Sequence, residues 1–200
     1  MNAPSTPITL DTPILTALDN GDRLAGFIRS GGITRAILLP PKAVREHPAA
    51  AWNTSLARVE GAMRYSDGQT NTQAMAEAGS AIAQFAIERG LYIPARDELD
   101  VVFRACKPTT DDNWGYRSGD NPSSVPPGYP HEAQRPAQCP IAEYQAGGAE
   151  ALPAGWVWSS TQTAGDAAYA WCQRFRRGRQ SFNLKSNEFE VVLVRSMIIG

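Results

Sequence analysis

The last quarter of the chain contains four strand-like segments separated by short turns, and this pattern constrains the fold more than any other feature. The segments are 155–160, 168–175, 180–184 and 190–196, and together they are rich in β-branched and aromatic residues. Segments of this length and spacing can pair with one another in sequence. The sequence therefore predicts a small twisted antiparallel sheet, with Trp158, Phe175 and Val192 as large apolar residues of its core.

Two segments upstream have the features of helices. Thr70 and Gln73 have the spacing of a capping box, apolar residues then recur every three or four positions, and Gly90 supplies a stop. These signals predict one helix over 71–89. A second helix is predicted from Pro94 to Ala105, with Pro94 in its first turn and acidic residues near its positive end.

The N-terminal sixty residues favour β structure. Arg23–Ile28 and Ile33–Leu39 are strand-like and flank Ser30-Gly-Gly32, a turn that tolerates positive φ. Together with the elements above, this predicts an α+β fold in which two helices pack against a small sheet and a β-rich segment precedes them. The stretch 107–155 has no convincing periodicity, and a loop of this length in a compact domain is usually functional.

The charge of the C-terminal segments is local. Between Trp171 and Phe189 there are five cations and one acid, although the whole chain has a formal net charge of −1. Arg and aromatic side chains at this density are typical of binding hot spots. We therefore predict a recognition surface made of Tyr169, Trp171, Arg174, Arg176, Arg177, Arg179, Phe182, Asn183, Lys185 and Asn187, with Trp114, Tyr116 and Tyr129 as secondary candidates in the long loop.

Strand alternation predicts how this surface is presented. Ala170 and Cys172 should point inward, and Tyr169 and Trp171 outward. A bulge near Gln173 would then return Phe175 to the core while Arg174 and Arg176 stay exposed, so that the outward residues form one contiguous patch. The alternative is that these side chains only solvate an edge hairpin and keep it from aggregating.

Groups suited to covalent chemistry are sparse. The three cysteines, Cys106, Cys139 and Cys172, form no Cys-x-x-Cys pair, which argues against a disulfide framework or a zinc site and favours free buried thiols. His47 and His131 have no second ligand at metal spacing. We therefore expect no metal, no cofactor and no catalytic residue. The loop acids Asp111, Asp112 and Asp120, with Asn113, could offer oxygen ligands to calcium, but their spacing favours solvated turns.

Composition also bears on partners and location. The isoelectric point near 6.1 falls short of the basic footprint of a nucleic-acid-binding protein, so we expect no nucleic acid partner. No apolar run is long enough to span a membrane, and the first ten residues lack the features of a secretory signal. These features predict a soluble chain made in the cytoplasm, without membrane insertion.

Several motifs in order resemble a known family. They are Leu91-Tyr-Ile-Pro-Ala-Arg-Asp-Glu-Leu99, Trp158-Ser-Ser-Thr-Gln162, Ala168-Tyr-Ala-Trp171 and Val191-Val-Leu-Val-Arg195. This pattern resembles the C-type-lectin-like domains of phage and prophage tail-associated proteins, of variable proteins of diversity-generating retroelements and of bacterial collagen-like adhesins. The resemblance covers residues 61–200. The segments 117–130 and 147–151 look like the phage and prophage branch.

The resemblance implies a function. It implies a C-type-lectin-like recognition domain over 61–200, preceded by a segment, 1–60, for attachment to the virion or for oligomerisation. The protein would be a non-enzymatic virion component of a tail tip or fibre, made in the host cytoplasm. Its partners would be a host-surface protein or glycan, other tail or fibre proteins, and further copies of itself. The calcium-dependent sugar motifs of animal lectins are absent, and Ala95 replaces the family's usual helix-capping Thr.

Two other functions remain open at this point. One is a structural decoration or cement subunit of the virion that uses the same surface to hold another virion protein. The other is a cysteine enzyme similar to formylglycine-generating enzymes, which would need a paired, accessible set of cysteines. Cys106 and Cys172 lie in segments that the sequence predicts to be buried, which disfavours the enzyme.

Overall fold

The N-terminal hairpin forms where the sequence predicts it. In the computed structural model, which describes residues 7–199, β1 (Arg23–Ser30) and β2 (Ile33–Leu39) pair antiparallel. The two residues between them, Gly31 and Gly32, have φ values of 56° and 79°. This left-handed conformation is accessible to glycine without a steric penalty, so the Gly-Gly pair fixes the position of the turn.

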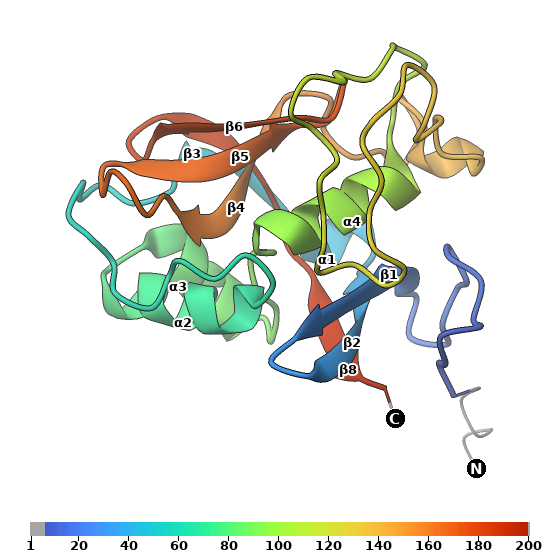
Figure 1. Cartoon of the computed structure of the whole chain (residues 1–200). Helices are drawn as coiled ribbons and strands as arrows, with labels where there is room; N and C mark the ends of the chain where they lie inside the picture. The colour runs from blue at the N-terminus through green and yellow to red at the C-terminus, as the bar shows by residue number, and fades with distance from the viewer. Residues whose placement is uncertain (1–6, 200) are drawn as a thin grey trace.

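The first sheet joins the two ends of the described chain (Figure 1). Its strand order is β1-β2-β8, and β8 (Arg195–Ile198) runs antiparallel to β2. The segment 1–60 is therefore β-rich, as predicted, and its strands share sheets with the C-terminal strands. Residues 1–6 of that segment lie outside the described part.

The second sheet has the order β3-β7-β4-β5-β6. Its strands are β3 (Glu46–Ala51), β4 (Trp156–Gln162), β5 (Tyr169–Arg174), β6 (Arg179–Leu184) and β7 (Glu188–Val192). The predicted final strand is split, because the chain leaves this sheet after Val192 and enters the first sheet at Arg195. The prediction of a purely antiparallel sheet is wrong, because β7 lies beside β4 rather than β6 and is parallel to it.

The predicted helix over 71–89 is two helices, α2 (Gly68–Glu77) and α3 (Ala81–Glu88). Gly79 lies between them with a φ of 82°, a conformation that ends a helix. The predicted capping box is also wrong. Asp67 is the N-cap and its side chain accepts a hydrogen bond from the Thr70 backbone N–H.

The second predicted helix is confirmed as α4 (Arg96–Cys106). Ala95 is its N-cap and cannot accept a hydrogen bond through its side chain. The Glu98 carboxylate supports this end instead, since it accepts from the backbone N–H groups of Ala95 at 2.8 Å and of Gly68 at 3.0 Å. Two short elements complete the fold, α1 (Lys42–Arg45) and the 3₁₀ turn η1 (Ala142–Tyr144).

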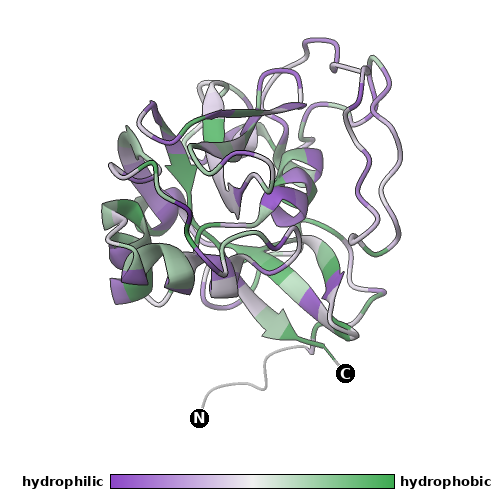
Figure 2. Ribbon diagram, turned by 60° about the vertical axis from the view of Figure 1, so that its left-hand side comes forward, coloured by the Kyte–Doolittle hydropathy of each residue, from purple (hydrophilic) through white to green (hydrophobic). Residues whose placement is uncertain are grey.

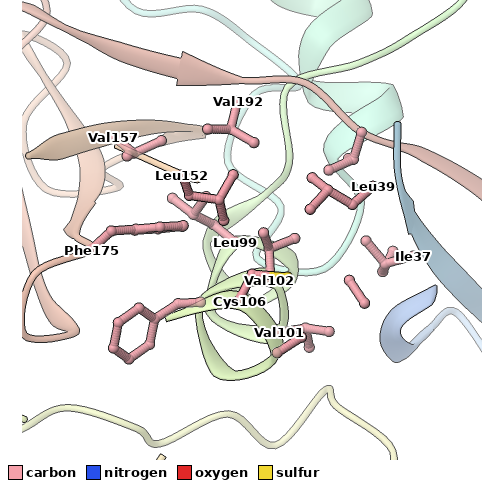
Figure 3. Packing of buried hydrophobic residues seen from close by; sticks show 14 of the residues in the cluster. Ile37, Leu39, Leu99, Val101, Val102, Cys106, Leu152, Val157, Phe175 and Val192 are labelled. Carbon is pink, nitrogen blue, oxygen red and sulfur yellow. The ribbon is translucent and has the colours of Figure 1, made fainter. Parts of the chain in front are cut away.

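Helix α4 packs between the two sheets and organises the main core (Figure 3). Leu99 and Val102 of α4 lie in one buried cluster with residues of β2, β4 and β7. A second cluster joins Met75 of α2 and Ile82 of α3 to Trp158. Trp158, Phe175 and Val192 are buried, which confirms the predicted core positions. Figure 2 shows hydrophobic residues along several of the strands and mostly hydrophilic or neutral residues along the long loops.

These findings confirm an α+β fold with two sheets. They also place the β5–β6 hairpin, which carries most of the predicted recognition residues, at one edge of the second sheet.

Candidate recognition surface

The aromatic residues of the β5–β6 hairpin gather on one face. Trp171 of β5 lies directly opposite Phe182 of β6, and their ring centroids are 5.8 Å apart in an edge-to-face arrangement. Tyr169 contacts the same Phe182 ring, also at 5.8 Å. The Phe182 side chain is 53% exposed, and Tyr169 and Trp171 are half-buried. Ala170 and Cys172 are buried, so the predicted orientation of this strand is confirmed.

Tyr65, which the sequence analysis did not identify, extends this face. It comes from the loop before α2, is 41% exposed and contacts Trp171 edge to face at 6.1 Å. We call Tyr65, Tyr169, Trp171 and Phe182 the aromatic cluster. An isolated tyrosine in a loop carries no sequence signal for such a contact, because the two residues are more than one hundred positions apart.

Arg96, the first residue of α4, lies under the cluster. Its guanidinium carbon is 4.7 Å from the centre of the Trp171 ring and 5.0 Å from that of Tyr65. These distances are those of cation–π contacts. Arg96 Nη2 donates to Gln180 Oε1 of β6 at 2.9 Å, and Nη1 lies 3.3 Å from Asp97 Oδ1. The cluster is thus supported by a helix end and a neighbouring strand.

Two donors in this region lack acceptors. Trp171 Nε1 and Arg96 Nε are both buried, and neither has a hydrogen-bond partner among the described residues. A buried donor without an acceptor costs free energy, typically about 1–3 kcal/mol. An acceptor on a bound molecule that reached either atom would remove that cost.

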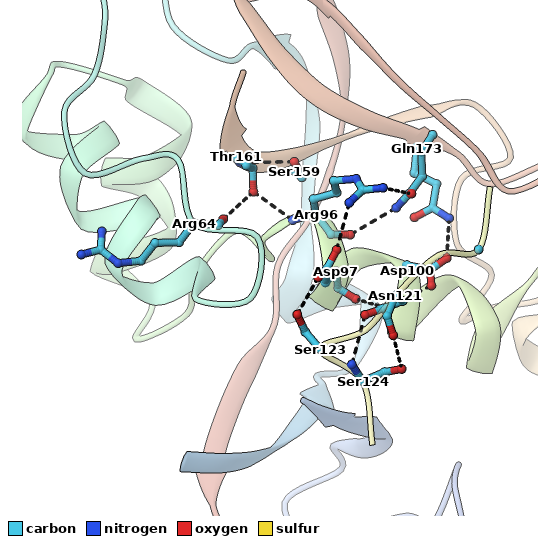
Figure 4. A network of polar contacts seen from close by, with 12 residues as sticks. Arg64, Arg96, Asp97, Asp100, Asn121, Ser123, Ser124, Ser159, Thr161 and Gln173 are labelled. Carbon is cyan, nitrogen blue, oxygen red and sulfur yellow. Dashed lines mark hydrogen bonds and ion pairs between the residues drawn. The ribbon is translucent and has the colours of Figure 1, made fainter. Parts of the chain in front are cut away.

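A polar network fixes the long loop against α4 (Figure 4). Asn121 Nδ2 donates to the Asp97 carbonyl oxygen at 2.8 Å and to Asp100 Oδ2 at 3.1 Å, and Ser123 Oγ donates to Asp97 Oδ2 at 2.7 Å. Gln173 of β5 donates to Asp100 Oδ1 at 3.1 Å. One side of α4 therefore positions both the hairpin and the loop.

The acidic residues of α4 have strongly shifted pKa values. Burial raises the pKa of Asp97 to about 6 and that of Glu98 to about 7. Burial alone would also raise the pKa of Asp100, but its contacts with His131 and Arg104 outweigh this effect and hold the pKa well below its ordinary value. These carboxyls are buried under the surface, so their contacts are internal.

The arginines of the hairpin turn bind the long loop rather than facing away from it. Arg176 Nε lies 2.9 Å from Asp111 Oδ2, and Arg177 Nε donates to the Asp112 carbonyl oxygen at 2.7 Å. The Arg179 guanidinium lies 5.0 Å from the centre of the Trp114 ring. We call Arg176, Arg177 and Arg179 the arginine turn. All three are exposed, and each has an internal partner in the loop.

Arg174 and the two asparagines lie apart from the aromatic cluster. Arg174 is exposed and pairs across the hairpin with Arg179. It lies three positions after Trp171 in β5, so strand alternation places the Arg174 side chain on the opposite face from that of Trp171. Asn183 Nδ2 lies 3.4 Å from Cys172 Sγ on that opposite face. Asn187 is half-buried in the turn before β7. The structure therefore places the predicted residues in separate groups.

The prediction that Lys185 belongs to an exposed surface is wrong. Lys185 is fully buried, and its Nζ donates to Gln162 Oε1 at 2.6 Å and to the Ala57 carbonyl oxygen at 2.9 Å. It also lies 4.6 Å from the centre of the Trp52 ring, and burial lowers its pKa to about 8. Lys185 joins the loop after β3 to the second sheet, a role that depends on residues more than one hundred positions away.

The predicted bulge near Gln173 is also wrong. The β5–β6 register is continuous, and the irregularity lies in β4, between Trp158 and Gln162. Phe175 reaches the core because the strand ends at Arg174 and the chain turns inward. Gln173 is buried because it shares the face of Trp171, where α4 covers it.

The secondary loop candidates form no single surface with the aromatic cluster. Tyr116 is 67% exposed and lies near Arg117. The guanidinium carbons of Arg104 and Arg135 lie 4.4 and 3.8 Å from the centre of the Tyr129 ring. Trp114 belongs to the contact with Arg179 described above.

His131 and the three cysteines are buried, whereas His47 is half-buried. His131 is buried against the Phe103 ring, 3.4 Å from Asp100 Oδ1, and His47 lies against Phe85. Cys106, Cys139 and Cys172 are free and buried, as predicted. Among residues 7–199, no group of three or more His, Cys, Asp or Glu side chains is arranged to hold a metal ion.

No helix in this range is long and apolar enough to cross a membrane.

Comparisons of the chain with protein-family models, with curated proteins and with solved structures find no match. The case for a function therefore depends on the motifs of the sequence and on the geometry described above.

Proposed function

We propose that this chain is a non-enzymatic recognition protein of a phage or prophage virion, with a C-type-lectin-like fold. It would act at a tail tip or fibre and bind a ligand on the host surface through the aromatic cluster. The fold assignment is supported by the ordered motifs from Leu91 to Arg195 and by helices α2 and α4 lying beside a small sheet. The virion assignment is supported by the resemblance of the loop 117–130 to the phage and prophage branch.

The observation that carries the binding role is the exposure of the aromatic cluster. Aromatic side chains contribute large contact areas and are enriched at binding hot spots. Here three of the four rings lie on an edge hairpin and Tyr65 packs beside them. The cluster is supported by Arg96 and includes a buried indole N–H without an acceptor among the described residues. A purely solvating surface would favour charged side chains, as edge strands commonly do.

The experiment measures binding of the labelled, purified chain to bacteria related to the strain that carries the gene. Phe182→Ala removes the most exposed ring of the cluster, and Tyr116→Ala removes an even more exposed ring elsewhere as the matched control. We expect Phe182→Ala to weaken binding at least tenfold, as expected for a hot-spot aromatic residue, and Tyr116→Ala to leave it unchanged.

Two results would change the proposal. Equal loss in both variants would show that the cluster is not the site. Binding to purified tail or fibre proteins, with none to cells, would favour the decoration or cement role through the same face.

The N-terminal segment is proposed to attach the chain to the virion or to another copy. The β1-β2-β8 sheet lies at the end of the molecule away from the β5–β6 hairpin (Figure 1), and it exposes Ile33 by 41% and Ile198 by 64%. Attachment at this sheet would leave the aromatic cluster free. Light scattering of the chain and of an Ile198→Glu variant tests self-association, and a monomeric parent chain would exclude the homo-oligomer.

A further inference from the structure

Two of the three free cysteines are neighbours in the core, although they are far apart in the sequence. Cys106 ends α4, and Cys139 lies in the long loop. The Cys139 backbone N–H donates to the carbonyl oxygen of Lys107, the residue after Cys106, at 2.9 Å. Both side chains belong to the same buried cluster. The third cysteine, Cys172, lies in the other cluster with Trp158.

The two thiols of this pair differ in acidity. The nearby Cys106 thiol, and to a smaller extent the Ile141 backbone N–H, stabilise the thiolate of Cys139 and lower its pKa to about 7. The same contact and burial raise the pKa of Cys106 well above its ordinary value. Burial raises the pKa of Cys172 to about 12. Since the thiolate is the nucleophile, Cys139 is the reactive thiol at neutral pH.

Cys139 also lies directly beneath the surface of the loop. It is 2% exposed, but the residue after it, Pro140, and the nearby Ala137 are exposed. We therefore expect a small neutral oxidant to reach Cys139 through local motion of this loop. Cys106 is fully buried, so we expect it to react with a modified Cys139 rather than directly with solvent.

We propose that Cys139 and Cys106 form a peroxide-sensitive thiol pair, and that the disulfide between them fixes the long loop to the end of α4. The Cys139 thiolate attacks hydrogen peroxide, the O–O bond breaks, and the products are a Cys139 sulfenic acid and hydroxide. The Cys106 sulfur then attacks the sulfenic sulfur, the S–O bond breaks, and water leaves with the Cys106 proton. The two thiols lose two electrons in all, and peroxide is reduced to water. This site is independent of the proposed recognition function.

The test treats the full-length chain with hydrogen peroxide, alkylates the remaining thiols and maps the peptides by mass spectrometry. We expect free thiols to fall from three to one, with Cys106 joined to Cys139 and Cys172 alkylated. A thiol reductant should restore all three. Oxidation of Cys172 at the same rate, or the absence of a peptide joining Cys106 and Cys139, would overturn the proposal.

Two variants separate the roles of the sulfurs. Cys106→Ser should allow the Cys139 sulfenic acid to accumulate, where dimedone captures it, and Cys172→Ser should behave as the parent chain. Dimedone capture at Cys106 in a Cys139→Ser variant would reverse the assignment of the attacking sulfur. In the parent chain, oxidation should raise the melting temperature by roughly 5–10 °C, because a disulfide constrains the unfolded state. An unchanged melting temperature would contradict the claim that the bond fixes the loop.

Discussion

The two ends of the β5–β6 hairpin use similar side chains in different ways. At one end the rings of Phe182 and Tyr65 are exposed, and Arg96 and the neighbouring rings contact the cluster from within the chain. At the other end the arginine turn is also exposed, but the loop residues Asp111, Asp112 and Trp114 already contact its side chains. Exposure alone therefore does not identify the recognition residues. The availability of internal partners separates the two ends.

The difference has a simple electrostatic origin. The long loop brings Asp111 to the hairpin turn, where it forms an ion pair with Arg176, and its Asp112 carbonyl oxygen accepts from Arg177. Among residues 7–199, no acidic partner of this kind covers the aromatic cluster, because the Tyr65 loop contributes another ring instead of a complementary surface. The predictions below test this division between the two ends, starting with the largest effect.

The largest effect is expected at Lys185, a fully buried cation. Lys185→Met keeps the side-chain length but leaves the buried acceptors Gln162 Oε1 and Ala57 O without their donor. We expect a loss of about 2–4 kcal/mol in the free energy of unfolding, measured by urea denaturation. Arg174→Met is the matched control and should change stability by less than about 0.5 kcal/mol. A small change in stability for Lys185→Met would contradict the claim that the Lys185 side chain has a buried structural role.

The second effect is a pH dependence of stability. Asp97 and Glu98 have folded-state pKa values of about 6 and about 7, above their ordinary values, so folding favours their protonated forms. Their unfavourable contribution is full above pH 7 and disappears as the pH falls toward 4. Asp100 has the opposite shift, and its stabilising contribution is lost only at more acidic pH, below its ordinary value.

Glu98→Gln isolates one of these groups. Its amide oxygen can still accept from Gly68 and Ala95, but it does not titrate. The stability difference between parent and variant should change by about 2–3 kcal/mol between pH 8 and pH 5, in the direction that favours the parent at pH 5. Urea unfolding at the two pH values measures it, and a pH-independent difference would show that Glu98 keeps an ordinary pKa.

Sequence patterns identified the elements that depend on local signals. The Gly31-Gly32 turn, the strand alternation around Ala170 and Cys172, and helix α4 all follow from residues close together in the chain. The break at Gly79 was missed because apolar spacing continues across it from Met75 to Ile82, so the periodicity outweighed the glycine.

The candidate site was harder to predict, since its composition depends on distant contacts. Lys185 is internal because the loop containing Ala57 covers it, and Tyr65 joins the cluster because its loop packs beside β5. The parallel pairing of β7 with β4 likewise has no local signature. The amino-acid composition identified the β5–β6 hairpin as the candidate recognition element. It could not show that the aromatic cluster and the arginine turn of this hairpin have different surroundings.

The smallest effect is expected at the arginine turn. The Arg176–Asp111 pair is exposed, and salt screens such pairs, so Arg176→Ala should leave the global unfolding free energy unchanged within error. Amide hydrogen exchange over 109–114 should become faster, because the loop loses an anchor. Unchanged exchange in this segment would show that the loop is held by its other contacts alone.

The central claim is that recognition depends on the aromatic cluster and not on the arginines of the same hairpin. The most direct measurement compares Trp171→Ala with Arg174→Ala in the cell-binding assay, with the melting temperature of each variant as the control for folding. The account predicts at least a tenfold loss of binding for Trp171→Ala, or about 1.4 kcal/mol or more, and little change for Arg174→Ala. Loss of binding in Arg174→Ala, with Trp171→Ala unaffected, would contradict it.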